Sequence, residues 1–264
     1  MKEKRIELIS DYVKKKTFVT NEELCSQFDI SMSTLRRDLG ILQNEGIIEK
    51  VYGGVKSSIS PPIETVSEHN LSPFSVRNEI NREAKSVIAE RAASFIEEED
   101  VIFIDTGTST VHILPYLAGF RHLTIITNSV YILYYCLNYP QITTMILPGE
   151  LFCKSGGIIG VECLTALEDY TINKSFMACT GLTIENGIVN SSPGEISIKR
   201  KALERSNRHF LLADSSKFNK SAMLSVAPLT DFDVIITEKE PEQSFLSFFS
   251  KNHIQCLVAK RSAS

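Results

Sequence analysis

Residues 20–56 read TNEELCSQFDISMSTLRRDLGILQNEGIIEKVYGGVK, and this stretch decides the fold of the first part of the chain. Its first letters, TNEE, form a capping box, in which the Thr20 hydroxyl accepts the backbone N–H of Glu23 and begins a helix. Upstream of it, apolar residues recur at helical spacing over residues 2–15. The sequence therefore predicts one helix before this stretch and a second helix at its start.

A third helix is predicted to begin in SMST, at residues 31–34. Its buried stripe consists of three leucines at helical spacing, Leu35, Leu39 and Leu42. Residues 47–51 predict a short strand, and the glycines at 53–54 turn the chain into a return strand. Two short helices joined by a tight turn and followed by a hairpin indicate a winged helix-turn-helix.

In that geometry, the first turn of the third helix enters the major groove of duplex DNA. Small hydroxyls there allow close approach to the DNA, arginine binds guanine or phosphate, and lysines on the hairpin meet the backbone. The candidate DNA-binding residues are Thr20, Ser31, Ser33, Thr34, Arg36, Arg37, Lys50, Tyr52 and Lys56. The alternative is a scaffold whose winged helix contacts another protein, with the two arginines on a solvated helix face.

A change in composition follows this module. Residues 57–73 contain serine or proline at eight positions and show little apolar periodicity, which is typical of a linker. We expect a DNA-binding domain over residues 1–56, a linker over 57–73 and a second domain over 74–264. The 264 residues are 43% hydrophobic and 23% charged, which suits folded domains and excludes a disordered or fibrous protein.

The charge is distributed unevenly. The whole chain carries −4, whereas residues 1–56 hold ten basic and nine acidic side chains, so DNA binding would depend on local clustering. No apolar run is long enough to span a membrane and no signal peptide is evident, which predicts a cytoplasmic protein without a membrane partner. The six cysteines lie far apart, which indicates reduced thiols, and we expect neither a metal site nor a cofactor.

The rest of the chain alternates short apolar runs with helical patterns, beginning with a helix over 74–96. The predicted strands are 101–104, 124–127, 143–147, 175–180, 210–213, 234–237 and 255–259. The predicted helices between them are 111–117, 130–137, 162–168, 195–206 and 242–249. This alternation predicts a mostly parallel sheet covered by helices on both faces.

Ligands of such sheets bind beyond the carboxyl ends of the strands. The first strand is followed by DTGTST (105–110), where glycine, backbone N–H groups and hydroxyls at a helix start suit a phosphate, although such a turn also serves as a helix cap. Polar residues or glycines follow later strands as well. The candidate ligand-binding residues are Asp105, Gly107, Thr108, Ser109, Thr110, Asn128, Gly149, Gly181, Glu195, Lys199 and Lys217.

Together these residues suggest a polar rim for a small phosphorylated polyol. An enzyme is the alternative function for the same rim. A sugar-phosphate isomerase needs a carboxylate base and a cation for the enediolate, which Glu195 with Lys199 or Lys217 could supply. The N-terminal module would then serve interaction with a partner.

The chain resembles the DeoR (deoxyribose-operon repressor) family of transcriptional regulators over nearly its whole length. The matching motifs of the first domain are SMSTLRRD (31–38) and EKVYGGV (49–55). Those of the second are NREAK (81–85), IDTGTST (104–110), TNS (127–129), LPG (147–149), TGL (180–182) and ADSSKF (213–218). One departure is Glu150, which stands where the family usually has a second glycine, and its carboxylate would narrow the pocket or add charge.

The resemblance implies an α/β fold class: an N-terminal winged helix-turn-helix plus a C-terminal, mostly parallel sensor domain resembling ribose-5-phosphate isomerase. It implies a repressor of a carbohydrate-catabolism operon that a phosphorylated sugar or polyol releases from double-stranded operator DNA. It also implies a homo-oligomer, either a dimer or a tetramer. By resemblance, residues 107–110 form a phosphate loop, and the residues around the sugar are Asp105, Asn128, Gly181, Glu195 and Lys217.

Overall fold

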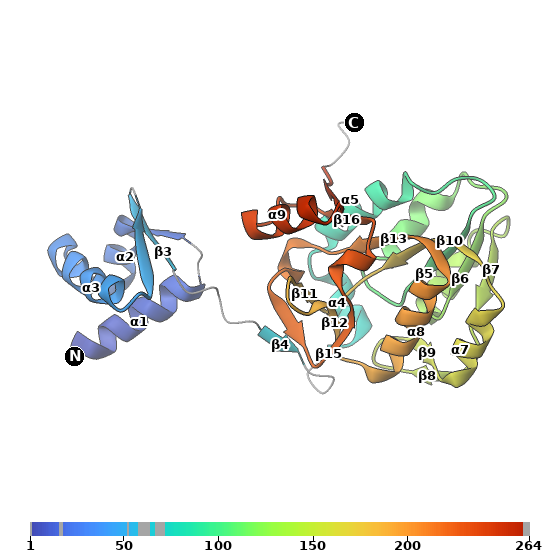
Figure 1. Ribbon diagram of the computed structural model, residues 1–264, viewed down its shortest axis with the longest axis horizontal. Helices are drawn as coiled ribbons and strands as arrows, with labels where there is room; N and C mark the ends of the chain where they lie inside the picture. Colours follow the sequence, from blue (N-terminus) through green and yellow to red (C-terminus); the bar gives the residue numbers. More distant parts are fainter. Residues whose placement is uncertain (1, 16–17, 52, 58–63, 67–71, 261–264) are drawn as a thin grey trace. The chain divides into compact units, whose positions relative to one another are not determined.

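The computed structural model of the chain describes residues 2–15, 18–51, 53–57, 64–66 and 72–260. The chain divides into two compact units, Met1–Ile63 and Glu64–Ser264, and each unit has its own apolar core (Figure 1). Tyr52, predicted in the hairpin turn to contact DNA, lies outside the described residues.

The first unit consists of three helices and a small antiparallel sheet. The helices are α1 (Lys2–Lys15), α2 (Asn21–Phe28) and α3 (Met32–Asn44). The sheet has the order β1-β3-β2, with β1 (Phe18–Thr20), β3 (Gly54–Ser57) and β2 (Ile48–Val51). The predicted winged helix-turn-helix is therefore confirmed, and β1 adds a strand that the sequence pattern does not predict.

One core and one buried ion pair hold this unit together. Apolar side chains from all three helices and the sheet meet in the core, among them Ile9, Val19, Leu24, Leu35 and Val55. The buried Asp38 carboxylate on α3 accepts hydrogen bonds from the Arg5 guanidinium on α1 at 2.8 and 3.4 Å. Burying an unpaired carboxylate would be unfavourable, so this contact fixes α3 against α1.

The second unit is built on a seven-stranded sheet of order β17-β16-β13-β10-β5-β6-β7, in which every neighbouring pair is parallel. The strands are β5 (Val101–Ile104), β6 (Thr124–Thr127), β7 (Thr143–Ile146), β10 (Ile172–Met177), β13 (Ser206–Leu212), β16 (Val234–Thr237) and β17 (Gln255–Val258). The α/β fold class predicted from the sequence is confirmed, and the main sheet is parallel throughout.

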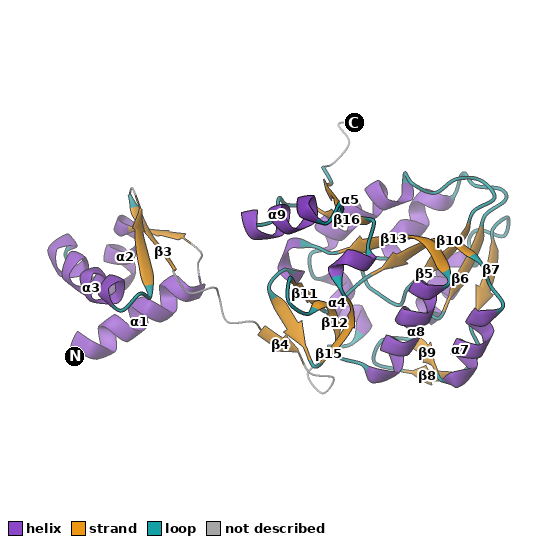
Figure 2. Ribbon diagram, viewed as in Figure 1, coloured by secondary structure: helices purple, strands orange, loops and turns teal. Residues whose placement is uncertain are grey.

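Helices cover both faces of this sheet (Figure 2). On one face lie α5 (Arg82–Ala93), the 3-10 helix η2 (Val111–Leu117) and α6 (Val130–Cys136). On the other lie α7 (Val161–Glu168), α8 (Pro193–Glu204) and α9 (Gln243–Lys251). Along β5, Ile102 and Ile104 enter the first core and Phe103 enters the second. A strand buried on both faces is apolar at every position, which explains the continuous apolar runs in the sequence.

The helix predicted over 74–96 is interrupted in the structure. It forms α4 (Phe74–Glu79) and α5, and between them Asn81 adopts a left-handed conformation with a φ of 55°. Asparagine tolerates this conformation better than most residues. The Asn81 amide donates to the Asp214 carboxylate at 2.9 Å, so a contact from far along the chain holds the break in place.

Several short strands outside the main sheet are not predicted by the sequence pattern. An antiparallel sheet contains β11 (Gly181–Thr183), β12 (Gly187–Asn190) and β15 (Leu224–Ala227), and a hairpin contains β8 (Glu150–Phe152) and β9 (Gly157–Ile159). β4 (Glu64–Val66) lies inside the predicted linker and pairs with β14 (Lys220–Ala222) of the second unit. Segments of three or four residues are too short to reveal a strand period.

We expect the exchange Phe210→Ala to destabilise the second unit strongly. The buried Phe210 ring lies 4.9 Å from the Phe176 ring and 5.1 Å from the Phe95 ring, centroid to centroid. Removing such a ring leaves a cavity and lowers the free energy of unfolding by about 3–5 kcal/mol. Urea unfolding followed by tyrosine fluorescence measures this unit, because six of the eight tyrosines follow residue 64.

The matched control is Val161→Ala, which shortens an exposed apolar side chain on α7. It should change the free energy of unfolding by less than about 0.5 kcal/mol. A comparably small change for Phe210→Ala would contradict the described packing.

Candidate functional site

The start of α3 presents a cluster of hydroxyl groups. Ser31 caps the helix, since its side chain accepts the backbone N–H of Thr34 at 3.3 Å. The Ser31 hydroxyl also lies 3.0 Å from those of Ser33 and Thr34. The three hydroxyls predicted to approach DNA are thus gathered at the tip of one helix.

Arg36 and Arg37 lie on the exposed side of α3. Neither forms a hydrogen bond or an ion pair with any described residue. On the other side of the helix, Leu35 is buried and Asp38 is paired with Arg5, whose pKa this hydrogen bond raises. The exposed side of α3, a helix described throughout, therefore carries two unpaired cations and no acidic side chain.

The remaining predicted DNA-binding residues have more varied settings. The Thr20 hydroxyl accepts the backbone N–H of Glu23 at 3.2 Å, which is the capping role that the sequence predicts. Lys56 pairs with Glu49 across the hairpin at 3.0 Å, whereas the exposed Lys50 has no ion pair among the described residues. For all of these residues, contact with DNA stays a prediction.

The second unit contains a pocket of about 530 Å³, including its open mouth, at the carboxyl ends of β5 and β10. This end of a parallel sheet is where α/β proteins bind ligands. Its wall is polar for the most part and comprises Arg77, Thr106, Gly107, Thr108, Ser109, Ser155, Ala178, Cys179, Thr180, Asn190, Glu195, Lys199 and Lys217.

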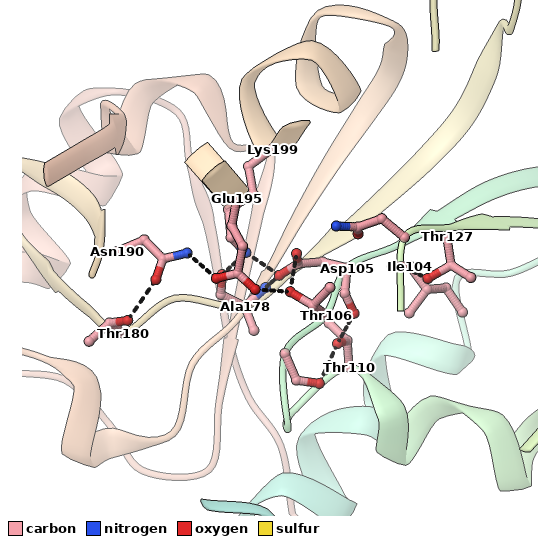
Figure 3. A network of polar contacts seen from close by, with 12 residues as sticks. Ile104, Asp105, Thr106, Thr110, Thr127, Ala178, Thr180, Asn190, Glu195 and Lys199 are labelled. Carbon is pink, nitrogen blue, oxygen red and sulfur yellow. Dashed lines mark hydrogen bonds and ion pairs between the residues drawn. The ribbon is translucent and has the colours of Figure 1, made fainter. Parts of the chain in front are cut away.

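A buried ion pair joins the elements around this pocket (Figure 3). The Lys199 ammonium on α8 pairs with the Asp105 carboxylate after β5, and it donates to the Ala178 carbonyl after β10 at 2.9 Å. The Ala178 backbone N–H donates to the same carboxylate oxygen at 3.1 Å. With side chains 1% and 4% exposed, Asp105 and Lys199 neutralise each other beside the pocket.

Glu195 is held in the wall by a chain of hydrogen bonds (Figure 3). The Thr106 hydroxyl donates to one carboxylate oxygen at 3.1 Å, and the Asn190 amide donates to the other at 3.2 Å. The Thr180 hydroxyl donates to the Asn190 carbonyl oxygen at 3.0 Å and sets the orientation of that amide. The carboxylate keeps lone pairs that can accept from the hydroxyls of a ligand.

The turn after β5 offers hydrogen-bond donors to the pocket. Among the described residues, no protein atom accepts from the backbone N–H groups of Gly107, Thr108 and Ser109 or pairs with the two hydroxyls. The Thr110 hydroxyl, in contrast, closes the turn by donating to the carbonyls of Asp105 and Gly107 at 2.7 and 2.8 Å. Because the helix that follows is a short 3-10 helix, the donors of the turn matter more than a helix dipole.

Arg77 and Lys217 add positive charge to the wall. Lys217, in the 3-10 helix η3 (Ser215–Lys217), forms no hydrogen bond or ion pair through its side chain with a described residue. Lys85 is buried close to both, with its ammonium on the Arg77 carbonyl. Burial, together with the charges of Lys217 and Arg77, lowers the pKa of Lys85 to about 8. The positive charge around the pocket favours an anionic ligand.

Cys179 places a thiol in the same wall. Burial raises its pKa to about 12, although Lys217 and Lys199 act in the opposite direction. The thiol is therefore protonated at neutral pH and adds no negative charge to the pocket.

Six of the eleven predicted ligand-binding residues line the pocket, namely Gly107, Thr108, Ser109, Glu195, Lys199 and Lys217. Asp105 and Thr110 lie directly behind the wall, where they hold Lys199 and the turn in position. Asn128, Gly149 and Gly181 lie outside the wall.

All three residues lie close to neighbouring backbone. The Asn128 amide donates to the Ile158 carbonyl at 3.0 Å. A Cβ at Gly149 would lie 2.3 Å from a backbone oxygen of Ile159, and one at Gly181 would lie 2.4 Å from a backbone oxygen of Lys220. Glu150, expected to narrow the pocket, is exposed and also lies outside the wall.

The sequence pattern does not single out seven residues of the wall: Arg77, Thr106, Ser155, Ala178, Cys179, Thr180 and Asn190. Thr106 and Thr180 belong to the motifs DTGTST and TGL, so their position at a strand end was a usable signal. Arg77 comes from a helix and Asn190 from a short strand of the second sheet, and no local pattern marks either residue.

The described residues contain neither a candidate metal site nor a candidate membrane span. No group of three histidine, cysteine or acidic side chains there could hold a metal ion. No helix there is both long and apolar enough to cross a bilayer. All six cysteines are free thiols.

Solved structures give a weak overall likeness to sugar-phosphate isomerases. Ribose 5-phosphate isomerase A of Methanocaldococcus jannaschii is 16% identical, with a TM-score of 0.39, over 52% of this chain and 55% of its own. A D-ribose-5-phosphate isomerase in complex with phospho-erythronic acid is 14% identical, with a TM-score of 0.40, over 52% and 54%. At these TM-scores the likeness carries no functional argument.

Two family models match the chain. The DeoR-like helix-turn-helix domain matches residues 5–60, and the DeoR C terminal sensor domain matches residues 80–239. The second match alone spans more than half of the 264 residues. The first model covers α3, and the second covers every residue of the pocket wall except Arg77.

Curated relatives cover nearly the whole chain. The HTH-type transcriptional regulator IolR of Bacillus subtilis is 35% identical over 96% of this chain and 98% of its own. The L-fucose operon activator of Haemophilus influenzae is 29% identical over 96% and 99%, and the glycerol-3-phosphate regulon repressor of Escherichia coli is 27% identical over 94% and 95%. Because these matches extend over both units, the chain belongs to the DeoR family of DNA-binding transcriptional regulators.

Proposed function

We propose that the protein is a repressor of a carbohydrate-catabolism operon. Residues 1–56 bind operator DNA, residues 74–264 bind a phosphorylated sugar or polyol, and the segment 57–73 connects the two. Binding of this effector releases the DNA. The effector half rests on one observation: Gly107, Thr108 and Ser109, whose backbone N–H groups have no acceptor among the described residues, line the same pocket as the unpaired Lys217.

The exposed side of α3 supports the DNA half of the proposal. Arg36 and Arg37 are unpaired and exposed, and the hydroxyls of Ser31, Ser33 and Thr34 cap the same helix. Guanidinium groups bind guanine edges or phosphates, and hydroxyls bind phosphates. A helix tip with both kinds of donor suits insertion into the major groove.

The charge of the pocket supports a ligand with one phosphate. Lys199 is neutralised by Asp105, and Glu195 opposes one of the two other cations of the described wall, Arg77 and Lys217. One positive charge and several N–H donors then remain for a phosphate ester, which carries about −1.5 to −2 at neutral pH. A second phosphate or a carboxylate on the ligand would meet Glu195 without a compensating cation.

The names of two curated relatives support a carbohydrate-linked role. One is a glycerol-3-phosphate regulon repressor and the other an L-fucose operon activator. The first name favours repression, whereas the second shows that both directions of control occur among relatives. Whether this chain represses or activates transcription is therefore part of the test.

Ligand-driven release requires that the effector bind the DNA-free state more tightly than the DNA-bound state. Coupling between two such sites typically amounts to about 1–3 kcal/mol. We propose a homo-oligomer, a dimer or a tetramer, for which two-fold symmetry would match repeated or palindromic half-sites in the operator.

The structure gives less support to a sugar-phosphate isomerase. Glu195 would be the base and Lys199 or Lys217 the cation. The Lys199 ammonium, however, is already engaged by Asp105 and the Ala178 carbonyl. The curated relatives are named as transcriptional regulators, which favours a protein that binds the sugar phosphate without converting it.

We expect Arg36→Ala and Arg37→Ala to weaken binding to the DNA upstream of the protein's own gene. Losing a guanidinium contact to a base costs about 1–3 kcal/mol, and losing a phosphate contact lowers the salt slope of log K by about 1. Arg→Lys at either position keeps the charge and should preserve the slope. Fluorescence anisotropy at several salt concentrations measures both quantities.

The control is Arg82→Ala, which removes an exposed cation from the second unit and should change neither quantity. Unchanged affinity and slope in both α3 variants would exclude α3 as the reading helix. Absence of any salt-dependent DNA binding by the wild type would favour the protein-binding scaffold instead.

We expect Lys217→Gln to weaken the binding of sugar monophosphates about tenfold or more, because a charge-assisted hydrogen bond contributes about 1.5–3 kcal/mol. Thermal-shift screening with aldose and polyol monophosphates measures this effect. A ligand at 100 times its Kd stabilises the wild type by about 2.7 kcal/mol. Lys239→Gln, at an exposed position outside the pocket, is the matched control.

Equal stabilisation of wild type and Lys217→Gln would remove this lysine from the effector site. The stabilising ligand is then added to the protein–DNA complex. Loss of DNA binding supports release of a repressor, and a gain would contradict that direction.

A further inference from the structure

Arg77 is the residue of the pocket wall that comes from α4, the first helix after β4. Its Nε donates to the Ser72 carbonyl at 2.9 Å, just before α4 begins. Its two terminal nitrogens form no hydrogen bond or ion pair with any described residue. One guanidinium therefore touches the start of α4 on one side and the pocket on the other.

The backbone of Arg77 is fixed by its neighbours. The buried Lys85 ammonium on α5 donates to the Arg77 carbonyl. One turn earlier, the Phe74 ring is 4% exposed and stacks on the Tyr131 ring, with centroids 3.8 Å apart and planes 11° apart. The main chain of Arg77 is thus held by its neighbours, and the Nε contact with the Ser72 carbonyl restrains a side chain that lines the pocket.

The electrostatic setting of Arg77 favours an anion. Burial lowers its pKa, whereas the nearby Glu195 and Asp105 favour the charged form. An arginine nevertheless stays protonated in proteins, so the guanidinium is a partly desolvated cation. Glu195 is committed to Thr106 and Asn190, and Asp105 to Lys199, which leaves the terminal N–H groups of Arg77 without an acceptor. A bound phosphate would supply that acceptor in bidentate geometry.

We propose that Arg77 contacts the phosphate of the ligand and couples occupancy of the pocket to the start of the second unit. Its terminal nitrogens bind the anion while Nε keeps the Ser72 carbonyl. Ser72 lies near the end of the segment 57–73, which joins the two units in sequence, so a ligand held by Arg77 would act next to that segment. The inference rests on the proposed function, because it takes a phosphorylated ligand in this pocket as given.

Arginine suits this double contact better than lysine, because its Nε and its terminal nitrogens point in different directions. The planar guanidinium offers five N–H groups in a fixed fork, so it can hold a carbonyl and an anion together. The ammonium of a lysine carries its three donors on one nitrogen at the end of a flexible stem, so both acceptors would have to lie against that nitrogen. Arg77→Lys should therefore keep most of the attraction for the phosphate and lose the coupling, whereas Arg77→Gln should lose both.

The experiment uses the full chain and four probes: ribose 5-phosphate, glucose 6-phosphate, glycerol 3-phosphate and inorganic phosphate. Calorimetry measures the Kd of each probe, and fluorescence anisotropy measures the DNA affinity with and without saturating probe. The variants are Arg77→Gln and Arg77→Lys. The matched control is Arg82→Gln, five residues away, whose guanidinium is exposed and contacts Glu79 at 3.4 Å.

For Arg77→Gln, we expect the Kd of the bound phosphate esters to rise about 10- to 100-fold. For Arg77→Lys, we expect a rise of less than about tenfold, with the probe no longer changing the DNA affinity. Arg82→Gln should match the wild type in both measurements.

Wild-type phosphate affinity in Arg77→Gln would overturn the inference and leave the proposed function intact. Full coupling in Arg77→Lys would overturn it as well, and this variant decides the matter if Arg77→Gln does not fold. Failure of the wild type to bind any probe would overturn both the inference and the proposed effector.

Discussion

The buried pair of Asp105 and Lys199 is the interaction on which the pocket depends. It links the carboxyl ends of two central strands to α8, the helix that also carries Glu195. Removing one partner of such a pair leaves an uncompensated buried charge, which typically costs about 3–5 kcal/mol. Because the charges of Asp105 and Lys199 cancel, the pair positions the wall but adds no net charge to the pocket. The charge of the pocket is set by Arg77, Lys217 and Glu195 at the wall.

The parallel sheet explains why distant segments meet at this site. All seven strands end at the same edge, so the turn after β5 and the segment after β10 become neighbours. The approach is so close that a Cβ at Gly107 would lie 2.1 Å from the Ala178 Cβ. The hydrogen-bond donors of the turn therefore rest on a rigid frame, and the cations come from short helices at its border.

Sequence reasoning succeeded where local pattern and tertiary structure agree. The capping box, the leucine stripe and the apolar runs each reflect burial within one element, so the winged helix and the main strands were predictable. Asn128, Gly149 and Gly181 follow strands as ligand residues do, yet they lie outside the wall of the described pocket. Arg77 was not identified because its place depends on the helix break at Asn81, which a contact 133 residues along the chain secures.

The protonated thiol of Cys179 has a consequence for the conditions under which the protein works. Oxidants and alkylating metabolites attack the thiolate, and burial suppresses that form here despite the neighbouring lysines. A sulfenic acid or a mixed disulfide at this position would enlarge a side chain of the pocket wall. Burial therefore disfavours such a modification of the pocket wall.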